Sequence, residues 1–293
     1  MKKLLVVGDS ICTRYLQVQR SHEVRPEYMN YIWQVPTYKY WFEYIAELLK
    51  VEIINKSYCG SGNQQIFDNT IYSLTNNEDI EYAIIGWSSF DRIDIPFEIE
   101  VTTSSGLIGE QKPQSDNLHL NLSTMMSSNE KYKHYIDNFR KDKFFNIFKM
   151  VDKFINYSKT VELLCQQKNI KLLQLFTVEP YQEGYEVKDL PNRNRVLKHL
   201  INKFDEIDSF WGYPGTGLLG GVCLYELYGM AEASKNKDWK EYVLCSDYVP
   251  NDERKHYIVD AHPNGKAHKL IFDTLKDSKH LKKWQSDLTN RKK

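Results

Sequence analysis

The sequence LLVVGDS, residues 4 to 10, joins an apolar run to a glycine and two polar residues. The run from Leu4 to Val7 is typical of a parallel strand with both faces covered, because no position in it is polar. Asp9 and Ser10 follow directly after Gly8. Since parallel sheets form their sites beyond the carboxyl ends of the strands, these two side chains are predicted to border a cleft.

Outward from this strand, apolar runs alternate with amphipathic stretches. Three further runs predict buried strands: Val51 to Ile54, Tyr82 to Gly86 and Lys171 to Val178. The pattern of apolar residues predicts helices at residues 38 to 50, from 63 onward, about 131 to 168 and about 264 to 283. The alternation of strands and helices predicts a parallel sheet with right-handed crossovers.

The chain has 293 residues, of which 41% are hydrophobic, so it can bury a sizeable core. We interpret residues 1 to 293 as one domain that carries two insertions. The first covers about 95 to 129 and is polar without clear periodicity, as a lid or insertion would be. The second covers about 210 to 248 and is rich in glycine.

The 39 basic and 39 acidic residues cancel, which argues against nucleic acid or an anionic membrane as a partner. No apolar run is long enough to span a membrane, and the run after Lys3 is too short for a signal peptide. We therefore expect a cytoplasmic protein, although a virion component would show the same features. Composition leaves the oligomeric state open.

The five cysteines are an odd number and include no CxxC pair. This pattern argues against a disulfide framework and against a cysteine-based zinc site. The histidines also lack the spacing of metal ligands, since His268 lies six residues after His262 and on another helix face. We predict reduced thiols and no metal site.

Polar motifs follow the other predicted strands and precede the last helix. The second strand is followed by NKSYCGSGN (55 to 63), the third by GWSS (86 to 89), and the last helix is preceded by DAHPN (260 to 264). A serine, a histidine, an acid and glycine-flanked backbone donors are thus expected at the same edge of the sheet.

Each motif also has a purely structural interpretation. Asp9 or Ser10 can cap the helix after the first strand, and Asp260 can cap a helix that begins near Pro263. His262 is then a partnered residue at the start of that helix. The order of the motifs along the chain favours the catalytic interpretation.

A strand ending in GDS near the N-terminus, an NxxxxGxxN loop and a DxHPN element together resemble the SGNH (GDSL) hydrolase family. The resemblance implies a three-layer α/β/α, flavodoxin-like parallel sheet. It implies Ser10 as the nucleophile, His262 as the base that accepts its proton, and Asp260 as the acid that orients the imidazole. The backbone N–H groups of Ser10 and Gly60 would form an oxyanion hole, and no metal or organic cofactor is needed.

Two positions depart from the family pattern. The family has an acid three residues before its histidine, where this chain has Val259. The family also supplies an asparagine side chain as a third oxyanion donor, where this chain has Ser88, and Asn63 is the alternative donor. Loss of one such donor typically lowers turnover by about 100- to 1000-fold.

Three residues near these motifs are candidates for contact with a substrate: Asp9, Trp87 and Arg92. The resulting hypothesis is a serine esterase that removes an acyl group, with acetyl expected, from a carbohydrate or another small ester. An acyltransferase with the same acyl-serine intermediate is an alternative. A binding or structural protein with a degenerate site is another, whereas nucleotide binding is disfavoured because GxGxxG is lacking.

Overall fold

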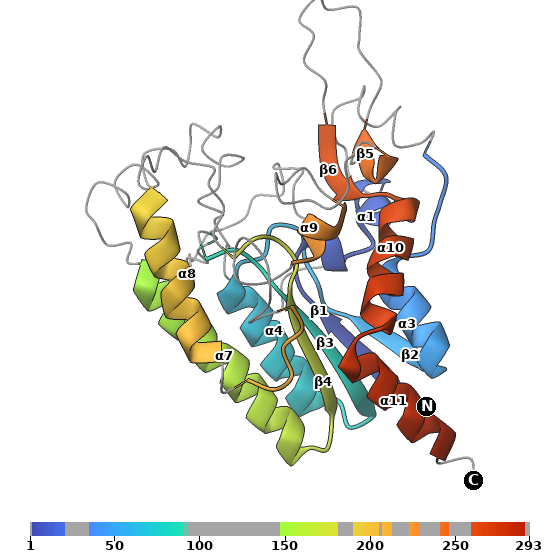
Figure 1. The fold of residues 1–293 in the computed structure, drawn as a ribbon. Helices are drawn as coiled ribbons and strands as arrows, with labels where there is room; N and C mark the ends of the chain where they lie inside the picture. Colours follow the sequence, from blue (N-terminus) through green and yellow to red (C-terminus); the bar gives the residue numbers. More distant parts are fainter. Residues whose placement is uncertain are drawn as a thin grey trace, which may run out of the picture.

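The computed structural model describes residues 2–20, 35–90, 92, 147–180, 190–204, 207–212, 223–228, 241–245 and 259–290. In this part of the chain, four parallel strands form a central sheet in the order β2-β1-β3-β4 (Figure 1). The strands are β1 (Lys3–Val7), β2 (Glu52–Asn55), β3 (Ile80–Trp87) and β4 (Lys171–Phe176). A parallel bridge between Gln174 and Phe210 adds a short contact beyond β4. The predicted parallel sheet and its flavodoxin-like order are confirmed.

Helices cover both faces of this sheet (Figure 1). One face is covered by α3 (Trp41–Leu49), α10 (Gly265–Lys276) and α11 (Lys279–Asn290). The other face is covered by α4 (Asn63–Asn76), α7 (Ile147–Gln167) and α8 (Leu190–Phe204). Three short elements lie nearer the carboxyl ends of the strands: the 3₁₀ helix η1 (Ser10–Cys12), α1 (Tyr15–Arg20) and α9 (Leu224–Tyr228).

The first strand contributes to two separate cores. Leu4 and Val6 belong to the core under α3 and α10, and Leu5 and Val7 belong to the core under α4 and α7. Successive side chains of a strand point to opposite faces, so a strand covered on both faces must be apolar throughout. All four side chains are fully buried, and each such burial contributes about 1.5–3 kcal/mol.

The C-terminal region differs from the single helix that the sequence predicts over 264 to 283. It forms two helices, α10 and α11. The break lies at Ser278, whose Oγ accepts a hydrogen bond from the backbone N–H of Leu281 at 3.3 Å. A serine before the first helical residue satisfies a backbone donor that the helix leaves unpaired. The single-helix prediction was wrong because apolar spacing continues through the break.

The DAHPN motif (260 to 264) precedes α10, as predicted, and its last residue, Asn264, caps that helix. The strand before the cap was not predicted: β6 (Val259–Pro263) pairs with β5 (Val243–Cys245) in an antiparallel ribbon. The insertion predicted at 95 to 129 lies outside the described residues, as do residues 131 to 146 of the predicted long helix. Of the insertion at 210 to 248, the structure describes three pieces, which include α9 and β5.

Within the described residues, no helix combines the length and apolarity that a membrane span requires. None of the four cysteines whose side chains are described forms a disulfide. Cys12, Cys165 and Cys223 are buried, and burial raises the pKa of all three thiols. These three thiols are therefore protonated at neutral pH.

The ends of β1 and β3 approach η1 too closely for a side chain. A Cβ atom at Gly86 would lie 2.6 Å from the Cys12 Sγ and 2.6 Å from the Thr177 Cγ2. A Cβ atom at Gly8 would lie 2.6 Å from the same sulfur and 2.9 Å from the Gly86 carbonyl oxygen. Glycine at both positions thus lets η1 turn directly above the sheet.

We predict that Gly86→Ala lowers the free energy of unfolding by about 1–3 kcal/mol, because the added methyl overpacks this contact. Urea denaturation of the wild type and the variant measures the loss. In a Cys12→Ala background the same substitution should cost less, since the sulfur is gone and only Thr177 still obstructs the methyl. An equal loss in both backgrounds would show that Cys12 is not the obstacle.

Candidate active site

Ser10 begins η1 at the carboxyl end of β1 and is half-buried. The cap of η1 comes from Asp9, whose Oδ1 accepts from the backbone N–H of Ile11 at 3.1 Å. The turn is closed by the N–H of Cys12, which donates to the Asp9 carbonyl oxygen at 3.0 Å. Because Asp9 caps the turn, the hydroxyl of Ser10 is not required for that purpose.

The second carboxylate oxygen of Asp9 joins three segments of the chain. It accepts from the Thr177 hydroxyl at 2.7 Å, the Ser88 hydroxyl at 3.2 Å and the Arg92 Nη1 at 2.9 Å. Asp9 is fully buried, and the Arg92 side chain is 13% exposed. A buried carboxylate is tolerated only when it is paired and hydrogen-bonded, and this one is both. The predicted substrate contact of Asp9 was wrong, because its carboxylate is fully buried in this ion pair. The substrate contact of Arg92 stays a prediction.

Trp87, the third predicted substrate contact, lies in the core under α4 and α7. Its side chain is fully buried, and its Nε1 donates to the Gln174 Oε1 at 2.8 Å. The indole also packs edge-on against Phe154. The prediction for Trp87 was wrong, because its position inside β3 turns the side chain into the sheet's core instead of the cleft.

The side chain of Asn63, at the start of α4, forms two hydrogen bonds with the backbone of Ser88. The Ser88 N–H donates to the Asn63 Oδ1 at 2.8 Å, and the Asn63 Nδ2 donates to the Ser88 carbonyl oxygen at 3.0 Å. The Ser88 hydroxyl is itself bound to Asp9. An amide nitrogen carries two N–H groups, so Asn63 keeps one for another acceptor, whereas Ser88 uses its single hydroxyl proton. The identity of a third oxyanion donor stays a prediction.

Gly60 lies in the loop between β2 and α4 with a φ of +78°. Of the residues that the structure describes, none has an atom within 4 Å of a Cβ built there. The loop is tied to β1 and η1, since the Tyr58 N–H donates to the Gly8 carbonyl oxygen at 3.1 Å and the Asn55 Nδ2 to the Cys12 carbonyl oxygen at 2.8 Å. Glycine suits this left-handed conformation, which other residues rarely adopt.

His262 lies in β6, which contacts η1. The chain therefore brings the element of the predicted base against the element of the predicted nucleophile. The imidazole is half-buried and stacks on the Tyr15 ring of α1, with ring centroids 3.6 Å apart and planes inclined by 12°. The backbone of Asp260 lies two residues earlier in the same strand, opposite Leu244, but its side chain is outside the described part of the chain.

The side chains of Tyr38 and Asn264 hold the turn from β6 into α10. The Tyr38 hydroxyl donates to the Pro263 carbonyl oxygen at 3.0 Å. Asn264 caps α10, because its Oδ1 accepts from the backbone N–H groups of Lys266 at 3.0 Å and Ala267 at 3.2 Å. The helix thus begins with Asn264 and not with Asp260, so the alternative that Asp260 caps it was wrong.

His268 lies behind this turn on α10 and is almost completely buried. Its Nδ1 accepts from the Trp41 backbone N–H at 3.4 Å. Burial, and to a smaller extent the neighbouring imidazole of His262, lowers the pKa of His268 to about 3. His268 is therefore neutral at physiological pH. Among the described residues, no group of three or more His, Cys, Asp or Glu side chains forms a metal-binding cluster.

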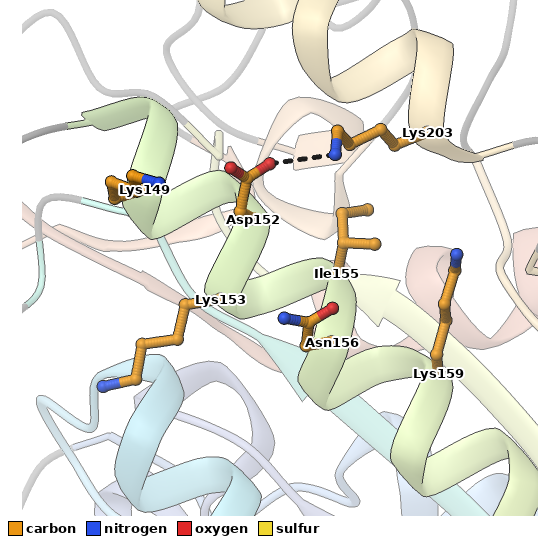
Figure 2. A pocket seen from close by; sticks show the side chains of 7 residues that line it. All are labelled: Lys149, Asp152, Lys153, Ile155, Asn156, Lys159 and Lys203. Carbon is orange, nitrogen blue, oxygen red and sulfur yellow. Dashed lines mark ion pairs between the residues drawn. The ribbon is translucent and has the colours of Figure 1, made fainter.

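A second feature lies away from these residues, along α7 and α8. A hollow there has a volume of about 540 Å³. Figure 2 shows the side chains that line it and the ion pair between Asp152 and Lys203, whose atoms are 3.1 Å apart. It is lined by Lys149, Asp152, Lys153, Ile155, Asn156, Lys159 and Lys203. None of the predicted site residues lines it. The hollow offers four ammonium groups and no nucleophile beside a base, so it does not compete with Ser10 as a catalytic site.

No family model and no curated protein matches this chain. A solved structure named for the lipolytic G-D-S-L family, from Desulfitobacterium hafniense DCB-2, matches over 94% of this chain and 98% of its own, with 10% identity and a TM-score of 0.38. The psychrotrophic esterase EstA from Pseudoalteromonas sp., inhibited by monoethylphosphonate, matches over 98% and 100%, with 13% identity and a TM-score of 0.40. At these identities the site chemistry must be taken from this chain's own geometry.

We predict that Asp9→Asn lowers the free energy of unfolding by about 3–5 kcal/mol. The amide leaves the Arg92 guanidinium without its counter-charge in a mostly buried position. Urea denaturation at neutral pH measures the loss. The control is Glu47→Gln, which removes the exposed ion pair with Lys39 and should change stability little. Similar losses in the two variants would contradict the structural role of the Asp9–Arg92 pair.

We predict that His268 makes the protein less stable as the pH falls below about 6.5. The folded-state pKa of about 3 lies below the ordinary value of 6.5, so in this window the unfolded chain binds a proton that the folded chain does not. The free energy of unfolding should therefore fall by up to about 1.4 kcal/mol per pH unit as the pH drops below about 6.5. Above that pH, His268 should not affect it.

Urea denaturation between about pH 7 and pH 5 tests this by comparing the wild type with His268→Asn, which retains a polar atom near the position of Nδ1. The difference in unfolding free energy between the two proteins should shift in favour of the variant as the pH falls. A difference that stays constant across this range would show that folding does not lower the pKa of His268.

Proposed function

We propose that this chain is a serine hydrolase of the SGNH (GDSL) type that cleaves ester bonds through an acyl-serine intermediate. The observation that carries the proposal is the contact between η1, which begins with Ser10, and β6, which contains His262. The elements that carry the proposed nucleophile and the proposed base come from opposite ends of the chain and lie in contact. The left-handed Gly60, whose Cβ position no described residue obstructs, lies in a loop bound to the same turn.

The proposed reaction has two stages. The Ser10 hydroxyl attacks the acyl carbon while His262 accepts its proton, and the backbone N–H groups of Ser10 and Gly60 stabilise the oxyanion. The imidazolium then returns the proton to the leaving alcohol, which departs as the acyl-serine forms. In the second stage His262 takes a proton from water, whose oxygen attacks the acyl-serine, and the acid is released with Ser10 restored. Asp260 is the proposed orienting acid.

The hydrogen bonds of Ser88 bear on the expected rate. Its hydroxyl proton is directed to Asp9 and is therefore not offered to an oxyanion. The remaining candidates are two backbone N–H groups and the second N–H of Asn63. If Asn63 does not replace the missing donor, turnover should be about 100- to 1000-fold below that of an enzyme with three donors.

The acyl group and its carrier are proposed from the family resemblance. We propose an acetyl group on a carbohydrate or another small alcohol as the substrate class. An acceptor hydroxyl in place of water would make the same intermediate serve acyl transfer. Separating hydrolysed acid from transferred ester by mass spectrometry distinguishes the two reactions.

A fluorophosphonate probe tests the activated serine directly, because it forms a covalent adduct with a serine that a base deprotonates. We expect one adduct per chain in the intact mass of the wild type. The adduct should be absent in Ser10→Ala and reduced by at least about 100-fold in rate in His262→Ala, since general-base assistance contributes about 10²–10⁴-fold.

The control is Ser61→Ala, which removes a buried serine in the Gly60 loop whose hydroxyl already binds the Tyr58 carbonyl oxygen and Gln65. This variant should be labelled like the wild type. Labelling that persists in Ser10→Ala would identify a different nucleophile. A folded wild-type protein that is not labelled at all would overturn the hydrolase proposal in favour of a binding or structural role.

A further inference from the structure

We propose that Tyr15 is a positioning residue for His262. The tyrosine ring stacks face to face on the imidazole and holds it in the orientation in which the imidazole reaches Ser10. The proposal rests on the function proposed for Ser10 and His262. It concerns a residue that lies five positions after the nucleophile, in α1, and that contacts the base at the other end of the chain.

The contact between the two rings is close and nearly parallel. The centroids of Tyr15 and His262 are 3.6 Å apart, and the planes differ by 12°. Most aromatic pairs have centroids about 4.5–7 Å apart, so this pair is in direct face contact. One face of the imidazole is thereby covered. Rotation of the imidazole out of this plane would require Tyr15 to move.

Tyr15 is itself fixed in place. It is 9% exposed and packs with Leu16 and Leu244, the latter in the ribbon that also contains His262. The backbone N–H of Leu16 donates to the Tyr40 hydroxyl at 3.1 Å. Burial raises the pKa of Tyr40 to about 12, so this hydroxyl remains protonated at neutral pH. The stacked ring is therefore anchored to the ribbon and to the start of α3.

A stacked aromatic ring serves the proposed chemistry in two ways. A base must hold its nitrogen within hydrogen-bond reach of the nucleophile, and a covered face limits the orientations of the imidazole. When His262 accepts the proton from Ser10, the resulting cation lies over the electron-rich face of Tyr15, which favours the charged form. The neighbouring His268 is neutral and adds no competing charge.

The substitutions that separate these effects are Tyr15→Phe and Tyr15→Leu. Phenylalanine keeps the stacked face, whereas leucine removes it and fills part of the volume. Tyr15→Met serves as a second non-aromatic variant if Tyr15→Leu does not fold. The matched control is Tyr44→Leu, which removes a tyrosine of α3 that stacks on Phe272 at 5.2 Å, away from η1 and β6.

The first measurement is the nuclear magnetic resonance spectrum of protein with ¹³C-labelled histidine. The ring current of the aromatic side chain at position 15 should shift the resonances of the His262 ring protons upfield in the wild type and in Tyr15→Phe. In Tyr15→Leu or Tyr15→Met these resonances should return toward the values of an unstacked histidine. Unchanged resonances in the non-aromatic variants would show that the rings are not stacked and would overturn the proposal.

The second measurement is the rate at which the fluorophosphonate labels Ser10. We expect a loss of roughly 10- to 100-fold in Tyr15→Leu, since a misplaced catalytic group costs up to about 10²-fold, with near-complete rescue in Tyr15→Phe. With an acetyl ester, kcat should fall while KM is unchanged. Tyr44→Leu should label at the wild-type rate.

The outcomes separate this proposal from the function on which it rests. A wild-type protein that is labelled on Ser10, with Tyr15→Leu labelled equally fast, overturns the positioning role and leaves the hydrolase proposal intact. A wild-type protein that is never labelled, even though its His262 resonances are shifted upfield, overturns the hydrolase proposal and the positioning role together. Slow labelling in Tyr15→Leu with rescue by phenylalanine supports both.

Discussion

The carboxylate of Asp9 is fully buried at the edge of the sheet and accepts hydrogen bonds from four different residues. An unpaired charge in such a place would be prohibitively costly, so the donors must converge on it whenever the protein is folded. One donor lies within η1, and the others follow β3 and β4. The turn with Ser10 is consequently held at one position above the sheet, and the glycines beneath it allow the close approach.

The opposite side of the candidate site is built with aromatic contacts. The ribbon with His262 belongs to no part of the central sheet, so no sheet hydrogen bonds fix it relative to β1. Tyr15 covers the imidazole, and the Tyr38 hydroxyl binds the carbonyl oxygen of Pro263. A polar network thus positions the proposed nucleophile, and a stacked ring and a capped turn position the proposed base.

In an enzyme, using polar side chains to hold the turn would leave fewer of them to bind the oxyanion. The donors that converge on Asp9 include the Ser88 hydroxyl, and the amide of Asn63 clasps the Ser88 backbone. The Ser88 hydroxyl stabilises the turn and its proton is thereby not offered to an oxyanion, whereas Asn63 keeps one N–H group. The oxyanion would depend on backbone N–H groups, of which those of Ser10 and Gly60 are the proposed pair. The hydrogen bonds that hold the turn with Ser10 are thus the same ones that engage the Ser88 hydroxyl, a predicted oxyanion donor.

The sequence by itself determined the sheet, because a run such as Leu4 to Val7 is apolar at every position only when both of its faces are buried. It also located the polar motifs at one edge, since parallel strands end on the same side. Only the tertiary structure decided the partners of those motifs. Thr177 meets Asp9, and Tyr15 meets His262, across separations that no local pattern records. Local periodicity reports which face of an element is buried, whereas a pairing between distant side chains depends on how whole elements pack.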